Sequence, residues 1–165
     1  MSDKQALLAD ASELLYREGF YLDQQRWDDW LALFTEDCEY WAPSWVSEHE
    51  QITDPQTEIS LLYLPSRYRL QERVDRVVSG ASPASVPLPR TCHFVSNIML
   101  DEFGDGQMQV HSAWRVDYFH QKKTGSFFGH YQHRLVEQGD GWMIAAKRIT
   151  VMNDFIPTVM DVYHI

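Results

Sequence analysis

The chain has 165 residues, 44% of them hydrophobic, and a formal net charge of −10 at pH 7. That length fits one domain spanning residues 1–165, which can bury enough surface to fold without disulfides or a structural metal. The acidic balance disfavours nucleic acid and anionic membranes as partners, because both select basic surfaces. The two cysteines, Cys38 and Cys92, are too few for a disulfide scaffold, so we expect free thiols, although a single bridge also fits.

The N-terminal residues and the hydropathy of the chain bear on where the protein resides. Residues 1–8 (MSDKQALL) lack the basic segment and apolar run of a secretory signal. No stretch approaches the roughly 18 apolar residues that a membrane-spanning helix requires. We therefore expect a cytoplasmic protein without a membrane partner.

Two helices are predicted at the start of the chain. Apolar residues from Leu7 onwards recur at helical spacing, and Glu18 falls on the same stripe. Asp3 is placed to N-cap this helix, which we expect to continue to about Gln25. A short second helix is predicted over Trp27–Phe34, because its large apolar side chains share one face.

The next segment mixes short elements and loops. A brief strand is predicted at Glu39–Ala42, followed by a polar loop over Ser44–Thr57. An apolar run, Ile59–Leu64, precedes a charged helix from Ser66 to about Val77. Residues 79–90 hold three prolines and several small residues, which predicts a long surface loop or arm rather than a domain linker.

The remainder of the chain predicts a sheet. Turn signals, two of them containing Asp-Gly, separate four strand candidates: Thr91–Phe103, Gln107–Phe119, Ser126–Glu137 and Trp142–Met152. The second strand alternates apolar and polar residues, as expected for a sheet with one buried face. Helices followed by an antiparallel meander predict an α+β fold, in which the N-terminal helices cover a curved sheet and form a half-open cone.

The sequence contains no pattern typical of metal binding or covalent catalysis. A Rieske cluster requires two Cys-His pairs, but the one adjacent pair is Cys92-His93. His130 and His133 are the closest histidines, and on a strand their spacing points them to opposite faces, so they cannot share a metal. There is no Gly-x-Ser-x-Gly elbow, phosphate loop or Rossmann fingerprint. We predict no catalytic, metal-binding or cofactor-binding residue on this chain.

General acid–base chemistry is the alternative that stays open, because it needs only one titratable side chain in a pocket of the cone. The conceivable residues are Asp23, Asp28, Tyr16, Tyr21, His93 and His111. Nothing in the sequence selects among them, and packing or helix-terminus roles account for them more simply. A stand-alone lyase or isomerase is thus the alternative function, and a small-ligand binding module is a third.

Two features favour a protein partner. Arg69, Arg73 and Arg76 share one face of the charged helix, where Glu72 is spaced to pair with Arg76. This face is either solvated or a polar contact surface. The apolar C-terminal residues Phe155–Ile165 suggest a segment docked on its own domain or on a neighbour. The candidate subunit-interface residues are Arg69, Arg73, Arg76, Trp114, Tyr118, Tyr163, His164 and Ile165.

Five blocks, in the same order along the chain, carry a resemblance to a known family. They are LLYREGFYLDQQRWDDWLALF at Leu14–Phe34, TDPQTEISLLY at Thr53–Tyr63, LQERVDRV at Leu70–Val77, PRTCHFVSNI at Pro89–Ile98 and NDFIPTVMDVYHI at Asn153–Ile165. Together they resemble the β (small) subunit of Rieske-type aromatic-ring-hydroxylating dioxygenases, in the benzoate and anthranilate branch.

The resemblance implies a fold and a role. The fold would be the cone shared with nuclear transport factor 2 (cystatin-like). The [2Fe-2S] Rieske cluster and mononuclear Fe(II) would lie in a larger catalytic α partner, within an α3β3 heterohexamer. A reductase component would supply NADH-derived electrons. The α subunit would then add O2 to an aromatic acid (benzoate, a substituted benzoate or anthranilate) and form a cis-dihydrodiol. The role of this chain would be structural, with an influence on substrate preference in some relatives.

Overall fold

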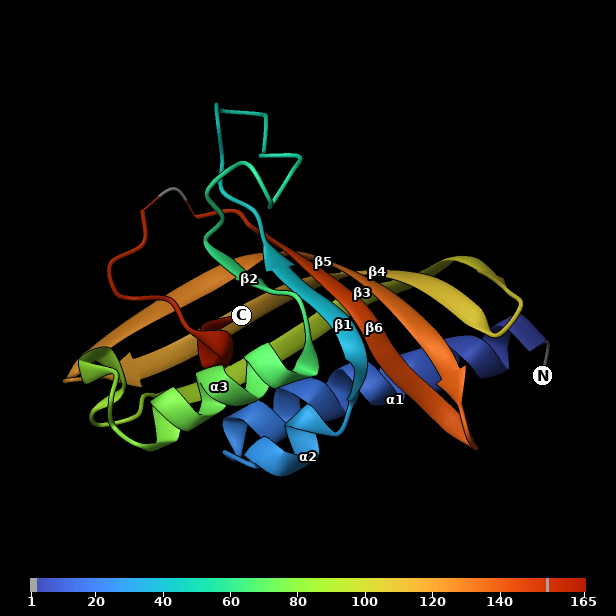
Figure 1. The fold of residues 1–165 in the computed structure, drawn as a ribbon, viewed down its shortest axis with the longest axis horizontal. Coiled ribbons are helices and arrows are strands. Elements are labelled where there is room, and N and C mark those ends of the chain that lie inside the picture. Colours follow the sequence, from blue (N-terminus) through green and yellow to red (C-terminus); the bar gives the residue numbers. More distant parts are fainter. Residues whose placement is uncertain (1–2, 154) are drawn as a thin grey trace.

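The computed structural model describes residues 3–153 and 155–165, which form three α-helices on the inner face of a curved six-stranded sheet (Figure 1). Helices α1 (Asp3–Asp23), α2 (Trp27–Leu31) and α3 (Arg67–Val78) lie together below the sheet. None of the helices in this described part is long and apolar enough to cross a bilayer. The predicted α+β arrangement of helices on a curved sheet is confirmed.

Helix α1 follows the predicted stripe, and the buried side includes Leu14, Leu15 and Leu22 together with Glu18. The helix contains Asp3 in its first turn instead of starting after it, so Asp3 is not the N-cap that we predicted. Helix α3 matches its prediction, because the Ser66 side chain caps it by accepting the backbone N–H of Arg69 at 3.2 Å.

Helix α2 is shorter than predicted, since Phe34 belongs to a strand. The backbone N–H of Ile144 donates to the Leu33 carbonyl at 2.8 Å, which draws the chain out of the helix and onto the sheet. Strand β1 (Phe34–Ala42) therefore starts well before the predicted Glu39. Phe34 is fully buried there, so the apolar face that predicted a helix serves the core from a strand instead.

The sheet has the strand order β2-β1-β6-β5-β4-β3. The long meander consists of β3 (Arg90–Gly104), β4 (Gln107–His120), β5 (Lys123–Gln138) and β6 (Gly141–Val151), close to the predicted limits. The predicted antiparallel meander is confirmed. The sheet is extended beyond it by β1, which runs parallel to β6, and the short β2 (Leu62–Leu64) then pairs with β1.

Strand β4 shows how the inner face is built. Its alternation is confirmed, because alternate residues from Met108 to Tyr118 are buried while the intervening side chains are more exposed. Tyr118 lies opposite Gly125 on β5, and a Cβ at Gly125 would come within 2.4 Å of the Tyr118 ring. Glycine is therefore needed for the aromatic ring to lie across the neighbouring strand.

The C-terminal turn closes the cone. Residues Val162–His164 form a 3-10 turn that lies between α3 and the sheet, near the label C in Figure 1. Ile165 is fully buried, and the Tyr40 hydroxyl donates to its carbonyl oxygen at 3.1 Å. The Tyr163 hydroxyl shares a 2.7 Å hydrogen bond with Ser85. The last five residues of the apolar segment, 161–165, are therefore docked on their own chain, whereas Phe155 and Val159 are 78% and 59% exposed.

Candidate functional site

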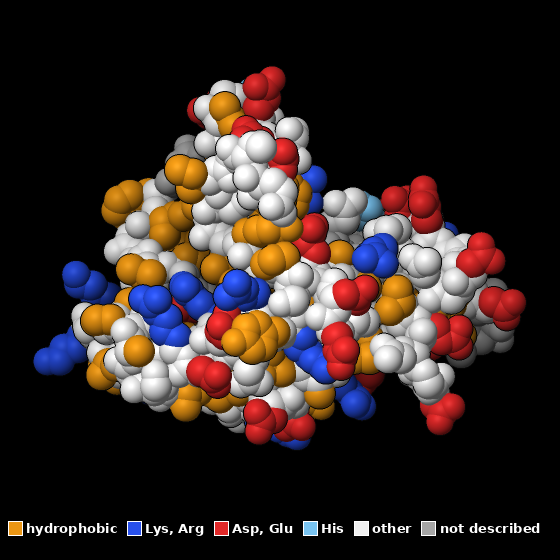
Figure 2. Space-filling view, in the orientation of Figure 1, with side chains coloured by type: hydrophobic (Ala, Val, Ile, Leu, Met, Phe, Trp, Pro, Cys, Tyr) orange, Lys and Arg blue, Asp and Glu red, His pale blue; other side chains and the backbone are white. Residues whose placement is uncertain are grey.

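The exposed face of α3 is the first candidate surface, and lysine and arginine side chains gather over this helix (Figure 2). Arg69 and Arg76 are exposed. Arg73 is only 23% exposed, because its Nε donates at 3.0 Å to the buried carboxylate of Asp161 and so fixes the C-terminal turn. The expected Glu72–Arg76 pair is not formed, since Glu72 accepts instead from Arg69 at 2.7 Å.

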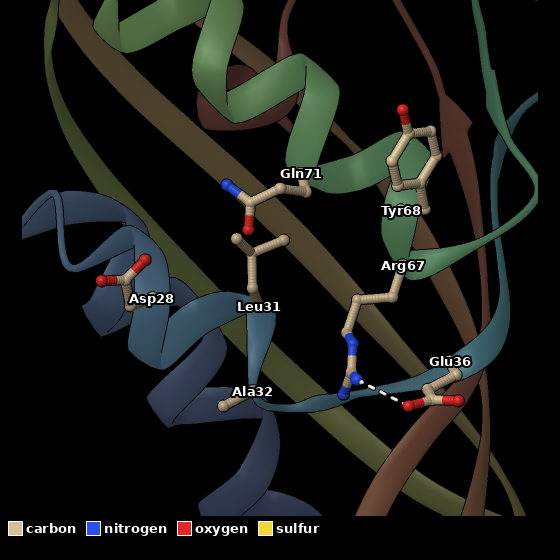
Figure 3. Close-up of a pocket in the computed structure, with 7 residues that line it drawn as sticks. All are labelled: Asp28, Leu31, Ala32, Glu36, Arg67, Tyr68 and Gln71. Atoms are coloured by element: carbon tan, nitrogen blue, oxygen red, sulfur yellow. Dashed lines mark hydrogen bonds and ion pairs between the residues drawn. The ribbon is translucent and has the colours of Figure 1, made fainter.

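A cleft of about 500 Å³ lies beside this face, between α2 and α3 (Figure 3). Leu31 and Ala32 form part of its lining, and Arg67 reaches across to Glu36 at 3.3 Å. Tyr68, on the rim, is 68% exposed. A cleft with a small apolar floor and charged walls can receive a side chain from another protein, because interfaces combine an apolar centre with a polar rim.

The interior of the cone brings together two of the six conceivable acid–base residues. Asp23, at the end of α1, lies 2.5 Å from Nδ1 of His93 on β3, and its second oxygen accepts the His93 backbone N–H at 2.8 Å. The Thr91 hydroxyl also donates to Asp23, at 2.9 Å. The carboxylate therefore fixes the orientation of the imidazole, whose side chain is 3% exposed.

The other acid–base candidates lie apart from this pair. Asp28 lines the α2–α3 cleft, and Tyr16 is exposed on α1. Tyr21 lies under the Arg26 guanidinium, 4.7 Å from the ring centroid. His111 is on the outer face of the sheet, 3.2 Å from Asp101.

Another buried cluster, which was not predicted, joins the middle of α1 to the sheet. Glu18 accepts from Lys147 Nζ on β6 at 2.7 Å, and its other oxygen lies 3.2 Å from His133 Nε2 on β5. Burial alone would raise the pKa of Glu18. The charge of Lys147 and the contact with His133 outweigh burial and hold this pKa at about 2, below its ordinary value. The Lys147 ammonium also lies 4.1 Å from the Tyr131 ring centroid.

The sequence did contain a signal for this cluster. Glu18 interrupts the apolar stripe of the first helix, and Lys147 occupies the same side of its strand as Ile149 and Val151. A charged residue in an apolar pattern is buried with a partner when the pattern is correct, because an unpaired buried charge is strongly unfavourable. The two residues are 129 positions apart, so the pattern shows that each needs a partner without showing which one.

Neither a metal site nor an activated thiol is assembled among the residues that the structure describes. His130 is exposed on the outer face of β5 while His133 is buried on the inner face, as their spacing predicted. Within residues 3–153 and 155–165, no group of three or more His, Cys, Asp or Glu side chains is placed to hold a metal ion. The two thiols are free, and burial raises the pKa of Cys38 to about 12, so it is not an activated nucleophile.

The remaining candidate interface residues are buried within this chain. Trp114 stacks on Tyr131 at 5.2 Å, and Tyr118 stacks on Phe127 at 5.6 Å, both on the inner face of the sheet. The C-terminal residues Tyr163, His164 and Ile165 are at most 2% exposed. These side chains support the surface of the protein from beneath, whereas Arg69 and Arg76 present charge at it.

Comparison with known proteins agrees with this geometry. The benzoate 1,2-dioxygenase subunit beta of Acinetobacter baylyi is 37% identical over 154 residues, which cover 93% of this chain and 91% of that one. The anthranilate 1,2-dioxygenase small subunit of the same organism is 32% identical, with 93% and 94% covered. The crystal structure of the beta subunit of benzoate 1,2-dioxygenase from Burkholderia mallei superposes with a TM-score of 0.79 at 32% identity, covering 95% of this chain and 96% of that one.

The family assignment follows from the extent of these matches. Residues 17–158 match the model of the ring hydroxylating beta subunit. Each of the three relatives is at least 32% identical and is covered over more than nine-tenths of its length. The predicted resemblance and its cone-shaped α+β fold are confirmed, and the chain belongs to the ring hydroxylating beta subunit family.

Proposed function

We propose that this chain is the structural, non-catalytic β subunit of an aromatic-ring dioxygenase, and that residues 1–165 act as one domain. The observation that carries the proposal is that the chain belongs to the ring hydroxylating beta subunit family. Its own C-terminal turn closes the interior of the cone, and the charged face of α3 is left at the surface. Its relatives are named for benzoate and anthranilate dioxygenases, which supports an aromatic carboxylic acid as the substrate of the whole enzyme.

The proposed partner is a larger catalytic α subunit in an α3β3 heterohexamer, with the Rieske cluster and mononuclear Fe(II) held by α. A separate reductase would deliver NADH-derived electrons, and the α subunit would form the cis-dihydrodiol. The absence of a metal donor set within the described parts of this chain is consistent with that division. We place the assembly in the cytoplasm, where NADH is available.

The exposed arginines Arg69 and Arg76, with the neighbouring α2–α3 cleft, are proposed to contact the α subunit. Arginine is favoured at interfaces because its planar fork pairs with carboxylates in two hydrogen bonds. The cleft continues this surface, and its exposed Tyr68 is of a residue type enriched in interface centres. Arg73 acts from within, by holding the C-terminal turn against the same helix.

A first experiment tests the assembly itself. The tagged chain is recovered from its native cells grown on an aromatic acid, and the mass and visible absorption of the co-purifying material are measured. A larger partner with red-brown iron–sulfur absorption, in equal molar amount, supports the proposal. A colourless, self-associated chain contradicts it and favours the stand-alone lyase or isomerase, for which a loss of turnover in His93→Ala with the oligomer intact would be the next check.

A second experiment tests the arginine face. The Arg69→Glu and Arg76→Glu variant should recover at least about tenfold less α subunit, because like charges then meet at the interface. Arg17→Glu is the matched control: Arg17 is 56% exposed and pairs with Glu13 on α1, while Arg69 is 57% exposed and pairs with Glu72 on α3. Equal recovery of α by both variants would remove this face from the interface.

A further inference from the structure

The loop between β1 and β2 projects from the sheet and ends in an acidic tip. Residues 44–58 form this projecting loop, which contains four carboxylates and no lysine or arginine. In Figure 1 the loop rises above the sheet, away from the β4–β5 turn, and Figure 2 shows acidic side chains at its end. The acidic tip, residues 46–50, is exposed throughout, and it includes an apolar residue, Val46, that is 63% exposed.

Hydrogen bonds hold the acidic tip in place. The backbone N–H of Val46 donates to the Glu50 carbonyl at 2.7 Å, and the Trp45 indole N–H donates to the Val151 carbonyl at 2.7 Å, which ties the loop to β6. The side chains of Glu48 and Glu50, by contrast, form no hydrogen bond or ion pair with any residue that the structure describes. A tip that is already ordered loses little conformational entropy when its free carboxylates meet a basic surface.

A hollow of about 510 Å³ on the outer face of the sheet has the opposite charge. It lies across β3, β4 and the start of β5, and its lining includes the exposed residues Arg90, Cys92, Arg115 and Phe119. The Arg90 guanidinium lies over the Phe119 ring, 4.6 Å from its centroid. Arg115 is paired with Asp117 at 2.7 Å, whereas Arg90 has no carboxylate partner in the part of the chain that the structure describes. This basic hollow therefore combines a free guanidinium with an accessible phenyl ring.

The surroundings of the basic hollow extend both of its properties. Lys122 and Lys123 are exposed in the β4–β5 turn, directly before residues that line the hollow, and neither is ion-paired with a described residue. In the strand register Arg115 lies between Phe94 and Phe128, which are 52% and 49% exposed. Cations beside exposed aromatic rings are typical of a protein interface, and here they occur on a chain with a net charge of −10.

We propose that the acidic tip of one copy of this chain docks into the basic hollow of a second copy. The carboxylates of Glu48 and Glu50 then face Arg90, and Val46 packs against the exposed phenyl rings. The two surfaces are opposite in charge and each offers apolar side chains, so they are complementary in both respects. No residue of the projecting loop lines the hollow of its own chain, and Figure 1 shows the two well separated, so the contact joins different copies.

Other surfaces match the acidic tip less well. Nucleic acids and anionic membranes would repel it, because they carry the same charge. On α3, the guanidinium groups of Arg69 and Arg73 are already neutralised by Glu72 and Asp161. The basic hollow offers unpaired cations beside exposed aromatic rings, which is the combination that the tip requires.

The contact is head-to-tail, because the tip and the hollow are different surfaces of the same chain. Contacts of this kind generate rings when the rotation closes. Such a ring leaves the α3 face free, so the proposed contact with the α subunit and this contact between copies can exist together. The inference itself does not rest on the proposed function.

The free thiol of Cys92 makes the contact testable, because it is exposed and lines the basic hollow. A full-length chain carrying Ser47→Cys and Cys92→Ser is mixed with the wild-type chain under a mild oxidant, so that a disulfide between tip and hollow must join two copies. This mixture should give at least about tenfold more covalent dimer than a control chain carrying Ser79→Cys and Cys92→Ser, because docking raises the local thiol concentration. Ser47 and Ser79 are both exposed serines, and Ser79 ends α3. Mass spectrometry of the linked peptides identifies the two positions.

Charge reversal in the hollow tests the chemistry of the contact. Arg90→Glu in the chain that keeps Cys92 should lower the dimer yield by at least about tenfold, because like charges then meet. Arg17→Glu, which changes an exposed arginine on α1, should leave the yield unchanged. An equal loss in both variants would mean that net charge alone controls the reaction, and would contradict docking at the hollow.

The same link is sought in the complex recovered from native cells that contain the Ser47→Cys, Cys92→Ser chain beside the wild-type chain. Equal yields for the tip and control thiols, in both the purified mixture and this complex, would overturn the proposal. A disulfide from the introduced thiol to a larger protein instead of to Cys92 would also overturn it and would assign the tip to a different partner. The linked peptides give the same answer whether or not the chain proves to be a dioxygenase subunit, so failure of the two proposals can be told apart.

Discussion

Two buried polar clusters fasten α1 to the sheet, and they differ in the groups that face the carboxylate. In the first, Glu18 accepts from Lys147 at 2.7 Å and lies 3.2 Å from His133, so opposite charges face each other directly. In the second, five residues further along the helix, Asp23 lies beside Nδ1 of His93 and accepts from the His93 backbone N–H and the Thr91 hydroxyl.

The difference separates a buried ion pair from a carboxylate that positions an imidazole. The Glu18 cluster fixes the position of the helix, because a carboxylate and an ammonium buried together must stay together. The Asp23 cluster fixes the orientation of an imidazole, because the carboxylate bonds both the ring and the backbone of His93. Both clusters are buried, so their protonation and their hydrogen bonds affect the stability of the fold.

The largest expected effect comes from breaking the first cluster. Glu18→Ala should lower the free energy of unfolding by about 3–5 kcal/mol, since it leaves the buried Lys147 without a counter-charge. Urea denaturation measures the change. Glu13→Ala, on the exposed side of the same helix, should leave the midpoint unchanged. A loss below about 1 kcal/mol would mean that Lys147 finds water or loses its proton, and that the cluster is not the fastening described here.

The next largest effect is the pH dependence of stability that comes from His164, in the C-terminal turn. Burial holds the pKa of His164 at about 3, compared with about 6.5 in the unfolded chain. The unfolded chain therefore binds the extra proton in this window, so stability is full above pH 6.5 and falls as the pH drops towards 3. Between pH 7 and 5 the contribution of His164 is about 2 kcal/mol, because each unit below the unfolded pKa is worth at most 1.36 kcal/mol.

The measurement compares urea denaturation of the wild-type chain and His164→Gln at pH 7, 6 and 5. The wild-type chain should lose about 2 kcal/mol more than the variant over this range. Working above pH 5 keeps Glu18 out of the comparison, because its lowered pKa removes stability only below its ordinary value of 4.5. His111→Gln, an exposed histidine, should keep the wild-type slope. Parallel slopes for wild type and His164→Gln would show that His164 is solvated.

The two clusters also mark how far the sequence could be interpreted. The alternation of β4 and the charged helix from Ser66 to about Val77 were predicted, because both are local patterns. Phe34 was assigned to a helix, since its pairing with β6 depends on residues more than a hundred positions away. The sequence also could not show which of the six acid–base candidates would meet. Asp23 and His93 are 70 residues apart, and their contact joins the end of a helix to a strand.

The candidate interface residues show the same limit of prediction from sequence. The sequence placed Arg69, Arg73 and Arg76 on one helical face, but it could not show that Arg73 is taken by Asp161. That contact depends on where the C-terminal turn docks, and an apolar tail fits its own chain and a neighbour equally well. The role of the arginine face toward a partner stays a prediction, which the charge-reversal variants address.

The smallest expected effect tests whether the C-terminal turn depends on its contact with Arg73. Arg73→Gln should lower the free energy of unfolding by about 1 kcal/mol, because the carboxylate of Asp161 is buried while the guanidinium is partly solvated. Arg76→Gln, one turn away and exposed, should have no effect. In the Arg73 variant the C-terminal turn is held less firmly, so His164 Nε2–H should exchange faster while the amide protons of α1 around Glu18 keep their protection. Equal acceleration at both places would mean that the C-terminal turn and the contacts of α1 around Glu18 open together rather than independently.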